Sequence, residues 1–450
     1  MGEKVIIIGA GLCGTLLALR LAQRGYTVTV YEKRPDMRKN TISAGRSINL
    51  ALSDRGLRGL ALAGVEEDVL PLTIPMYGRM LHPQVGEETM VKYSGRDGEW
   101  INSVSRGGLN MVLLDKAEAT GKVHLHFGKG CDEVDLETGS VTLRDEATGS
   151  TFTDRAEVVF GTDGANSAIR NAMLRESARY RFDFSIKYLP TAYKELEIPP
   201  AEGGGFRLEK NALHIWPRDG FMMIALPNLD GSFTVTLFLP HTGEVSFAQL
   251  TDDILIRSFF EQYFPSACAH MPDLISDFHS NPTSSLGTVK CYPWQVNGKF
   301  LLMGDAAHAV VPFYGQGMNA SFEDVLVLDG LIDKYAGDWS GILVEYQKIR
   351  KQDADAIADL AVENELEMRS ATADPVFLLK RKIELKMEQT YRDYFSKYSM
   401  VTFREDLPYS YAMKRGRAQD EILMKYAAGI NSMAEFDEQE VLRLIHTLDG

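Results

Sequence analysis

The segment GAGLCG at residues 9–14 constrains the fold more than any other part of this sequence. The apolar run KVIIIG precedes it as a buried type of strand, and the pattern from Gly14 to Arg24 is that of a helix. The run TVTVYE follows as a second strand. Because two parallel strands need such a crossover, residues 1–32 predict a βαβ unit.

The spacing Gly-x-Gly-x-x-Gly in this context predicts a dinucleotide-binding loop. Gly9 permits the tight turn, Gly11 lets the backbone approach a pyrophosphate, and Gly14 allows the helix to pack closely on the strand. The helix N-terminus favours the anion. Glu32, at the end of the second strand, suits a free ribose hydroxyl and would repel a 2′-phosphate. FAD or NAD is therefore expected here.

Bulk composition excludes several classes of protein. The 450 residues are enough for two or three domains, and a net charge of −14 argues against nucleic acid or an anionic membrane as the main partner. The four cysteines form no C-x-x-C pair, so neither a disulfide framework nor a zinc site is expected and a reducing cytoplasm is the default. No apolar run approaches the roughly 20 residues of a membrane helix.

Two further acidic residues follow apolar strands. Asp163 lies in GTDGANSAIR at 161–170, and Asp305 lies in FLLMGDAAHAVVPFYGQGMN at 300–319. Asp305 could cap the next helix and the glycines could form a turn. A simple NAD dehydrogenase, however, has no need of two more acidic strand ends at one crevice. His308 reads as a histidine that packs a helix.

Together the three motifs resemble the flavoprotein aromatic hydroxylases, the single-component monooxygenases of the p-hydroxybenzoate hydroxylase type. That resemblance implies FAD, with the second motif contacting both FAD and the reduced nicotinamide, and with Asp305 accepting a hydrogen bond from the ribityl chain. It also implies that Arg106, in SRGGLNMVLL, contacts the cofactor. The residues implied to lie beside the isoalloxazine ring are Gly315, Gln316, Gly317, Met318 and Asn319.

Four blocks sharpen the likeness to the kynurenine 3-monooxygenase branch of that family: GRSINLALSDRG (45–56), MYGRMLH (76–82), VPFYGQGMN (311–319) and VENELEMR (362–369). By resemblance, Arg79 and Tyr93 bind the α-carboxylate of L-kynurenine. The other implied residues are Asn364 and Tyr398 in support, Phe238, Leu226 and Ile224 on an apolar wall, Pro312 and Phe313 in the catalytic pocket against the flavin, and Ala51 at the cofactor.

The implied reaction is hydroxylation of L-kynurenine to 3-hydroxy-L-kynurenine with NADPH and dioxygen, through a C4a-hydroperoxyflavin. The residues match what this reaction requires. An aniline ring is already activated for hydroxylation and needs no base. The carboxylate of an amino-acid substrate does need a cationic partner, and the planar guanidinium of Arg suits it best. Two alternatives stay open. One is a related hydroxylase of another, phenolic acid, and the other is a flavin-binding sensor without catalysis.

The predicted fold class is α/β, with a Rossmann-type FAD-binding domain interwoven with a mainly antiparallel substrate domain and a helical C-terminal region. The expected FAD-binding domain comprises residues 1–70, 101–178 and 286–330. Residues 71–100 and 179–285 would form the substrate domain, and 331–450 a helical region over the substrate pocket. The acidic ending EFDEQEVLRLIHTLDG lacks the anchor of eukaryotic relatives, so a soluble form is expected. The oligomeric state is open, a homodimer included.

Overall fold

The computed structural model describes residues 3–39, 49–370 and 374–449, without the side chains of 369 and 370. The start of the GRSINLALSDRG block, residues 45–48, lies outside this range. The chain divides into two compact units. The first comprises residues 1–73, 104–188 and 287–358, and the second comprises 74–103, 189–286 and 359–450.

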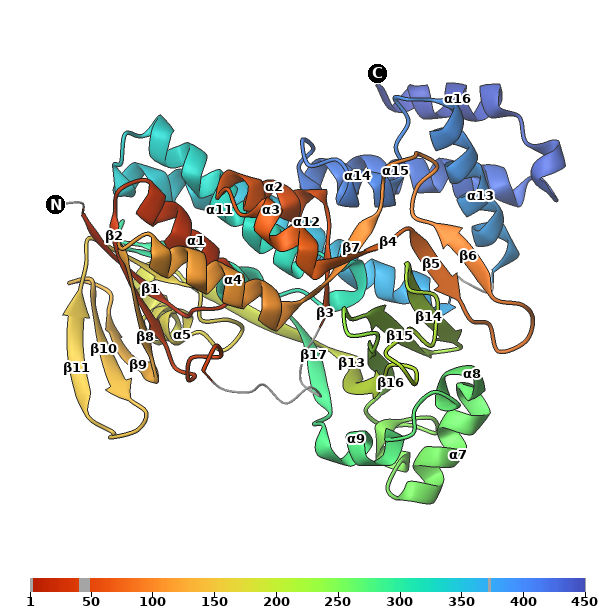
Figure 1. Ribbon diagram of the computed structural model, residues 1–450. Helices are drawn as coiled ribbons and strands as arrows, with labels where there is room; N and C mark the ends of the chain where they lie inside the picture. Colours follow the sequence, from red (N-terminus) through yellow and green to blue (C-terminus); the bar gives the residue numbers. More distant parts are fainter. Residues whose placement is uncertain (1–2, 40–48, 371–373, 450) are drawn as a thin grey trace. The chain divides into compact units, whose positions relative to one another are not determined.

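The first unit is built on a sheet in the order β18-β19-β12-β1-β2-β8. Figure 1 labels three of its strands, β1, β2 and β8. Five strands of this sheet run parallel and only β18 is antiparallel to its neighbour. The buried residues of β1 and β12 are apolar, as expected for central strands covered on both faces. The strands are β1 (Lys4–Ile8), β2 (Thr27–Glu32), β8 (Val123–Phe127), β12 (Val158–Gly161), β18 (Gln295–Val296) and β19 (Phe300–Leu302).

The predicted βαβ unit is confirmed. Helix α1 (Leu12–Gln23) connects β1 to β2, which pair in parallel. The helix begins two residues earlier than the sequence pattern predicted, because Gly11 serves as its N-cap residue. It ends before Gly25, whose φ of +101° is a conformation that favours glycine.

The remaining elements of the first unit surround this sheet. A second, smaller sheet has the order β11-β10-β9. The elements are β3 (Asn49–Leu52), β9 (Lys129–Asp135), β10 (Ser140–Asp145), β11 (Thr151–Arg155), α2 (Asp54–Leu62), α3 (Glu66–Val69), α4 (Arg106–Ala119), α5 (Ala168–Arg175), α6 (Ser177–Tyr180), α10 (Asp305–His308) and α11 (Gly317–Lys334).

The second unit carries most of a sheet in the order β17-β13-β16-β15-β14-β5-β6, of which residues 183–188 of β13 and 287–292 of β17 are assigned to the first unit. The prediction of a largely antiparallel sheet is confirmed, with the pair β14–β5 as the parallel exception. Strand β13 is the longest in this sheet and runs for 16 residues. The bounds are β4 (Thr73–Met76), β5 (Gly78–Leu81), β6 (Thr89–Lys92), β7 (Ile101–Ser105), β13 (Asp183–Ile198), β14 (Ala212–Arg218), β15 (Phe221–Pro227), β16 (Phe233–Pro240) and β17 (Ser284–Tyr292).

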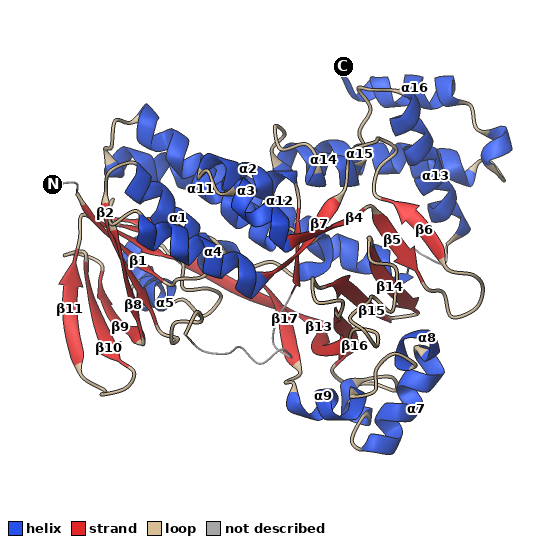
Figure 2. Cartoon of the chain, viewed as in Figure 1, coloured by secondary structure: helices blue, strands red, loops and turns tan. Residues whose placement is uncertain are grey.

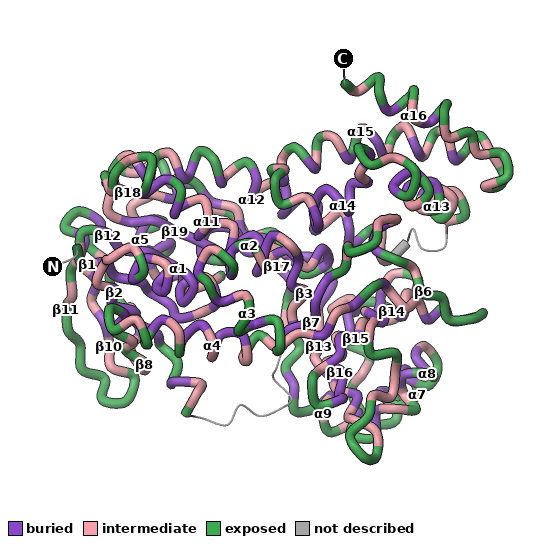
Figure 3. The backbone as a smooth tube through the Cα atoms, turned by 45° about the horizontal axis from the view of Figure 1, so that its top comes forward, coloured by how far each residue is buried: buried purple, intermediate pink, exposed green. Residues whose placement is uncertain are grey.

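One face of this sheet packs against three helices that the sequence pattern did not predict. They are α7 (Asp253–Tyr263), α8 (Pro265–Cys268) and α9 (Leu274–Ser280). Met223, Val235 and Leu237 of the sheet join Phe260 and Phe264 in one buried cluster. The backbone trace of Figure 3 marks the mostly buried course of β15 and β16. Because side chains alternate along a strand, the neighbouring positions of β15 and β16 point to the opposite face. That face carries the residues described below.

The predicted helical character of the C-terminal part is confirmed (Figure 2). Its helices are α12 (Trp339–Ser370), α13 (Pro375–Thr390), α14 (Lys397–Thr402), α15 (Tyr409–Ala428) and α16 (Glu438–His446). Within the ranges that the structure describes, no helix has both the length and the apolar character needed to cross a membrane.

Candidate active site

The three glycines of the GAGLCG loop have three different environments in the first unit. Gly9 has φ +102°, and a Cβ there would lie 2.6 Å from the carbonyl oxygen of Thr162. A Cβ on Gly14 would lie 2.1 Å from the carbonyl oxygen of Gly9. A Cβ on Gly11 would have nothing within 4 Å. The loop is thus closed against the protein at Gly9 and Gly14, and it leaves open space above Gly11.

Glu32 ends β2 beside this loop. One carboxylate oxygen accepts a hydrogen bond from the backbone N–H of Ala10 at 2.8 Å, and the other accepts from Arg34 at 2.9 Å. Burial opposes ionisation, but these hydrogen bonds and the charge of Arg34 hold the pKa of Glu32 below its ordinary value. An ionised carboxylate at this position can accept hydrogen bonds from sugar hydroxyls.

Two buried polar atoms near the loop lack a partner among the described residues. They are Oδ1 of Asp163, which follows β12, and Oδ1 of Asn110, on α4. The other Oδ of Asp163 accepts from the N–H of Ala168 at 2.6 Å, and Nδ2 of Asn110 donates to the carbonyl oxygen of Ala10 at 3.0 Å. Buried acceptors without donors are costly unless a ligand or water supplies the donor. Burial raises the pKa of Asp163 above its ordinary value.

The second and third motifs are tied together by Arg170, the arginine that ends GTDGANSAIR. Its guanidinium donates to the carbonyl oxygen of Ala306 at 2.8 Å and also to that of Ala165. Ala306 lies on α10, one residue after Asp305. Asp305 itself is exposed, so its carboxylate is accessible at the end of β19.

The loop of residues 315–319 is fixed by the side chain of Asn319, which is fully buried. Its amide donates to the carbonyl oxygens of Ala51 and Gly315, both at 2.9 Å, and its oxygen accepts from the N–H of Ser53 at 3.0 Å. Gly315 has φ +67°, a conformation that favours glycine. Asn319 therefore brings Ala51 and the glycine-rich loop together.

The other predicted residues of the first unit differ in accessibility. Pro312 is exposed, whereas Phe313 and Tyr314, in the same single 3₁₀ turn, are buried. Arg106 begins α4 and is exposed. Gln316 and Met318 flank Gly317 at the start of α11 and are both buried.

In the second unit, Arg79 of β5 meets two tyrosines. Its Cζ lies 5.3 Å from the ring centroid of Tyr93 and 4.6 Å from that of Tyr398. The two rings are stacked, with centroids 5.6 Å apart and planes 10° apart. Nε of Arg79 and the hydroxyl of Tyr93 are buried and have no hydrogen-bond partner within the described part of the chain. This cation can still bind an anion.

The strand register puts the predicted apolar wall on the same side of the sheet as Arg79. Leu213 pairs with Arg79, and Ile215, two residues further along β14, pairs with Ile224. Phe238 pairs with Met222, which shares a face with Ile224 and Leu226 of β15. On this face the half-buried cation of Arg79 shares a side with apolar side chains, and the face is opposite to the one that packs against α7–α9. The residues on it are Arg79, Ile224, Leu226 and Phe238.

The last turns of α12 reach this face as well. Thr191 of β13 lies on the side of Phe238, because its neighbour Tyr193 pairs with Phe238. The Thr191 hydroxyl donates to the buried carboxylate of Glu365 at 3.1 Å. Asn364, the residue before Glu365, is also buried. Within the second unit this contact brings the last turns of α12, which carry Asn364, to the side of the sheet on which Phe238 lies.

The comparisons with known proteins define the class first. The sequence profile of a family described as "FAD binding domain" matches residues 3–361, which is most of the chain. The open space above Gly11 and the unpartnered acceptors of Asp163 and Asn110 fit a bound dinucleotide. The class is therefore that of the FAD-binding flavoproteins, and FAD is the cofactor.

Curated relatives then narrow the class. The chain is 47% identical over 446 residues to a kynurenine 3-monooxygenase of Myxococcus xanthus, covering 99% of this chain and 95% of the relative. It is 45% identical to one of Flavobacterium johnsoniae, covering 93% of each, and 43% identical to one of Dictyostelium discoideum, covering 95% and 94%. This chain belongs to the kynurenine 3-monooxygenase family.

Solved structures support the same fold. A 2-methyl-3-hydroxypyridine-5-carboxylic acid oxygenase superposes with a TM-score of 0.67 at 19% identity, covering 86% of this chain and 97% of that chain. PqsL of Pseudomonas aeruginosa superposes with a TM-score of 0.66 at 20% identity, covering 82% and 97%. At these identities the likeness concerns the fold alone.

Sequence reasoning missed several residues that the structure places at these sites. Asn110 had a weak local signal, because it follows Arg106 by one helical turn on α4. Glu365 had none, because its role depends on a strand that is distant in sequence. Asp324, on α11, meets the turn that carries Asp305 and is described below. Its neighbourhood in the sequence shows only an acidic pair within a helix.

Proposed function

We propose that this protein hydroxylates L-kynurenine to 3-hydroxy-L-kynurenine, using FAD, NADPH and dioxygen. The observation that carries the substrate assignment is the position of Arg79, a half-buried cation whose buried Nε is unpaired and which lies beside two stacked tyrosines and near apolar side chains. An aromatic amino acid offers the complementary combination of one carboxylate and one flat apolar ring.

The first unit is the proposed FAD-binding region. The open backbone at Gly11 would approach the pyrophosphate, and Glu32 would accept hydrogen bonds from the adenosine ribose. Asp305 would accept one from the ribityl chain. The other proposed cofactor residues are Gly9, Gly14, Ala51, Arg106, Asp163, Gly315, Gln316, Gly317, Met318 and Asn319. Bound FAD supplies the activation of dioxygen after reduction by NADPH.

The second unit supplies the proposed substrate site. Arg79 would bind the α-carboxylate through charge-assisted hydrogen bonds, and its planar guanidinium matches the two oxygens better than an ammonium would. Burial raises the pKa of Tyr93 well above its ordinary value, so its hydroxyl stays protonated and can donate to the same carboxylate. Tyr398 and Asn364 would support the clamp, and Phe238, Leu226 and Ile224 would contact the aromatic ring.

Two roles concern the reaction itself. Pro312 and Phe313 would form the wall of the catalytic pocket against the flavin and help to exclude water, which would otherwise divert reduced cofactor to hydrogen peroxide. The helical region 331–450 would cover the substrate, and the contact between Glu365 and Thr191 supports this role for the last turns of α12. A cytoplasmic location and a homodimeric assembly belong to the same proposal.

The test is NADPH oxidation by the purified flavoprotein with and without L-kynurenine, combined with product analysis. Oxidation stimulated by kynurenine and coupled to 3-hydroxykynurenine supports the proposal. Stimulation that yields only hydrogen peroxide would make kynurenine an effector, and stimulation by phenolic acids alone would identify a related hydroxylase. A protein that holds FAD but is stimulated by none of these compounds would be a sensor rather than an enzyme.

A further inference from the structure

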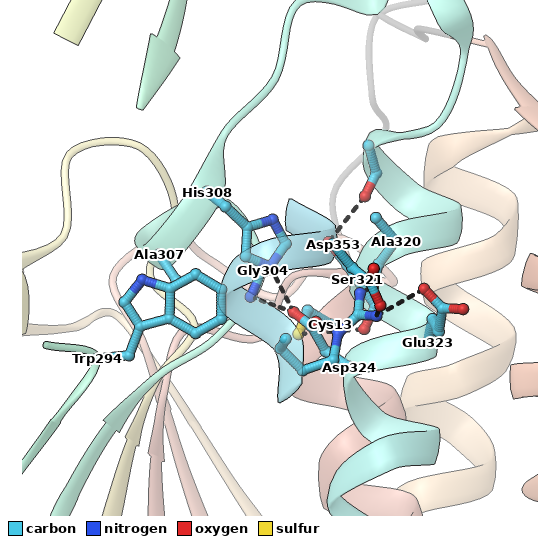
Figure 4. Close-up of polar contacts among 12 residues, drawn as sticks. Cys13, Trp294, Gly304, Ala307, His308, Ala320, Ser321, Glu323, Asp324 and Asp353 are labelled. Carbon is cyan, nitrogen blue, oxygen red and sulfur yellow. Dashed lines mark hydrogen bonds and ion pairs between the residues drawn. The ribbon is translucent and has the colours of Figure 1, made fainter. Parts of the chain in front are cut away.

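A fully buried carboxylate lies under the turn that carries Asp305. Asp324, on α11, accepts three hydrogen bonds in the first unit (Figure 4). The donors are the backbone N–H of Gly304 at 2.9 Å, Nε2 of His308 at 2.7 Å and Nε of Arg350 at 2.8 Å. All three partners donate, so only a group that accepts with both oxygens satisfies them.

Two of these donors flank Asp305 in the chain. Gly304 is the residue before it, and His308 ends the short helix that Asp305 begins. On its other side the turn is closed by the GAGLCG loop: a Cβ on Gly304 would lie 3.1 Å from both Cβ and Sγ of Cys13. The turn is therefore held between Cys13 and Asp324, and Asp305 projects from it to the surface.

The carboxylate is kept ionised by its partners. Burial opposes ionisation, but the charges of His308 and Arg350 and the hydrogen bonds hold the pKa of Asp324 well below its usual range. Arg350 is itself fixed, because it also donates to Glu323 at 2.7 Å and to the carbonyl oxygen of Ala320 at 3.2 Å. His308 thus does more than pack a helix, which was its predicted role.

We propose that Asp324 is a positioning residue for the FAD site: it fixes Gly304 and His308 so that Asp305, between them, presents its carboxylate to the ribityl chain. This inference rests on the proposed placement of FAD at Asp305. Asn at position 324 would fill the same volume, but its NH₂ would face a donor and leave part of the turn unsupported.

The chain offers a matched control on the same helix. Asp329, also on α11, is buried and binds Arg20 through Nε at 2.7 Å and also Arg24, within the same unit. No hydrogen bond or ion pair described for Asp329 reaches residues 304–308. Asp329→Asn therefore removes a buried carboxylate of the same helix that accepts hydrogen bonds from arginine, but it leaves the turn of residues 304–308 unchanged.

The experiment measures FAD dissociation from the holoenzyme by flavin fluorescence, the visible circular dichroism of bound FAD, and the melting temperature of each variant. Asp324→Asn should raise the dissociation constant about tenfold or more and change the dichroism. Asp329→Asn should lower the melting temperature while changing the dissociation constant by less than about twofold. Equal effects of the two variants on FAD affinity, at equal loss of stability, would overturn the proposal.

Three further variants keep the test decisive. If Asp324→Asn does not fold, the test uses two variants of His308. His308→Gln keeps an N–H donor, so it should bind FAD more tightly than His308→Leu. Equal FAD affinity in these two variants would contradict the proposal. Asp305→Asn separates the inference from its premise. If it leaves FAD affinity and dichroism unchanged, the placement of FAD at Asp305 is wrong. If it weakens FAD while Asp324→Asn behaves like Asp329→Asn, only the role of Asp324 is wrong.

Discussion

The guanidinium carbon of Arg79 lies 4.6 Å from the ring centre of Tyr398, and the Tyr93 ring stacks on Tyr398 with only 10° between the planes. A cation next to aromatic rings is held in place without an opposing carboxylate. Among the described residues, Arg79 forms no ion pair, so its charge is available to a ligand. This relationship is the basis of the first two predictions.

Removing the cation should weaken substrate binding strongly. Arg79→Ala should raise the KM for L-kynurenine by about a hundredfold, because it removes a charge-assisted, two-oxygen contact with the carboxylate. The KM of Arg79→Lys should lie between that of the unchanged protein and that of Arg79→Ala, since an ammonium contacts the carboxylate only as a point charge. Steady-state kinetics with product analysis measure both. Lys210→Ala, at an exposed lysine beside the Phe206 ring in the same unit, is the control and should leave KM unchanged.

The hydroxyl of Tyr93 should affect binding and stability in opposite ways. It is buried, and no other described residue completes a hydrogen bond with it. Tyr93→Phe should leave the free energy of unfolding unchanged or raise it by about 1 kcal/mol, because it removes an unsatisfied polar group. The same change should raise the dissociation constant of kynurenine about fivefold if the hydroxyl donates to the carboxylate. Lower stability with normal binding would assign the hydroxyl to the fold instead.

Gly11 and Gly14, the second and third glycines of the GAGLCG loop, should respond differently to alanine. A Cβ on Gly11 meets nothing within 4 Å, so Gly11→Ala should keep the melting temperature of the apoprotein and lose FAD, whose pyrophosphate needs that space. A Cβ on Gly14 would collide with the carbonyl oxygen of Gly9 at 2.1 Å, so Gly14→Ala should destabilise the apoprotein itself. Flavin content and thermal unfolding distinguish the two. Full flavin occupancy in Gly11→Ala would place the cofactor elsewhere.

Acid should destabilise the second unit through a buried histidine. His214 of β14 hydrogen-bonds to the carbonyl oxygen of Glu209 at 2.8 Å and to Nε2 of His82 at 2.8 Å, so a further proton would disrupt this arrangement. Burial, as the largest cause, lowers the pKa of His214 from 6.5 to about 4. His82 contacts Glu88 and Arg218, and burial lowers its pKa as well.

The direction of this pH effect follows from the lowered pKa of His214. The unfolded chain binds the proton more readily, so the stability from neutral His214 is present above pH 6.5 and is lost as the pH falls toward about 4. The difference between the two pKa values corresponds to a loss of roughly 3 kcal/mol at most in the free energy of unfolding. Urea unfolding at about pH 7.5, above this window, and at about pH 6.0 and 5.0, within it, measures the loss. His214→Phe should flatten the profile, whereas His279→Gln, at an exposed histidine, should not.

The local motifs were readable from the sequence because their function depends on neighbouring residues. The glycine spacing at 9–14, with a strand on each side, predicted the βαβ unit, and the structure differs only in starting α1 two residues earlier. The roles of Gly9 and Gly14 follow from backbone conformation and close approach within a few residues. Asp163 and Asp305 were found because each directly follows a buried strand.

The substrate face was identified from family resemblance rather than from pattern. Arg79, Tyr93 and Tyr398 come from β5, the residue after β6, and α14, and no periodicity connects them. Their contact depends on the register of β5 with β14 and on the packing of a helix from the far end of the chain. Likewise, nothing local marks Asp324 as the acceptor for Gly304, because the hydrogen bond joins two separate elements.

The sequence by itself determined the class of cofactor loop, the order of strands and helices in the first unit's βαβ unit, and the positions of the acidic strand ends. These features are encoded in short-range spacing, backbone conformation and hydrophobic period. Only the tertiary structure decided which residues share the face with Arg79 and which buried charges support the turn at Asp305. Such contacts arise from long-range strand pairing and helix packing, whose energies depend on residues far apart in the chain.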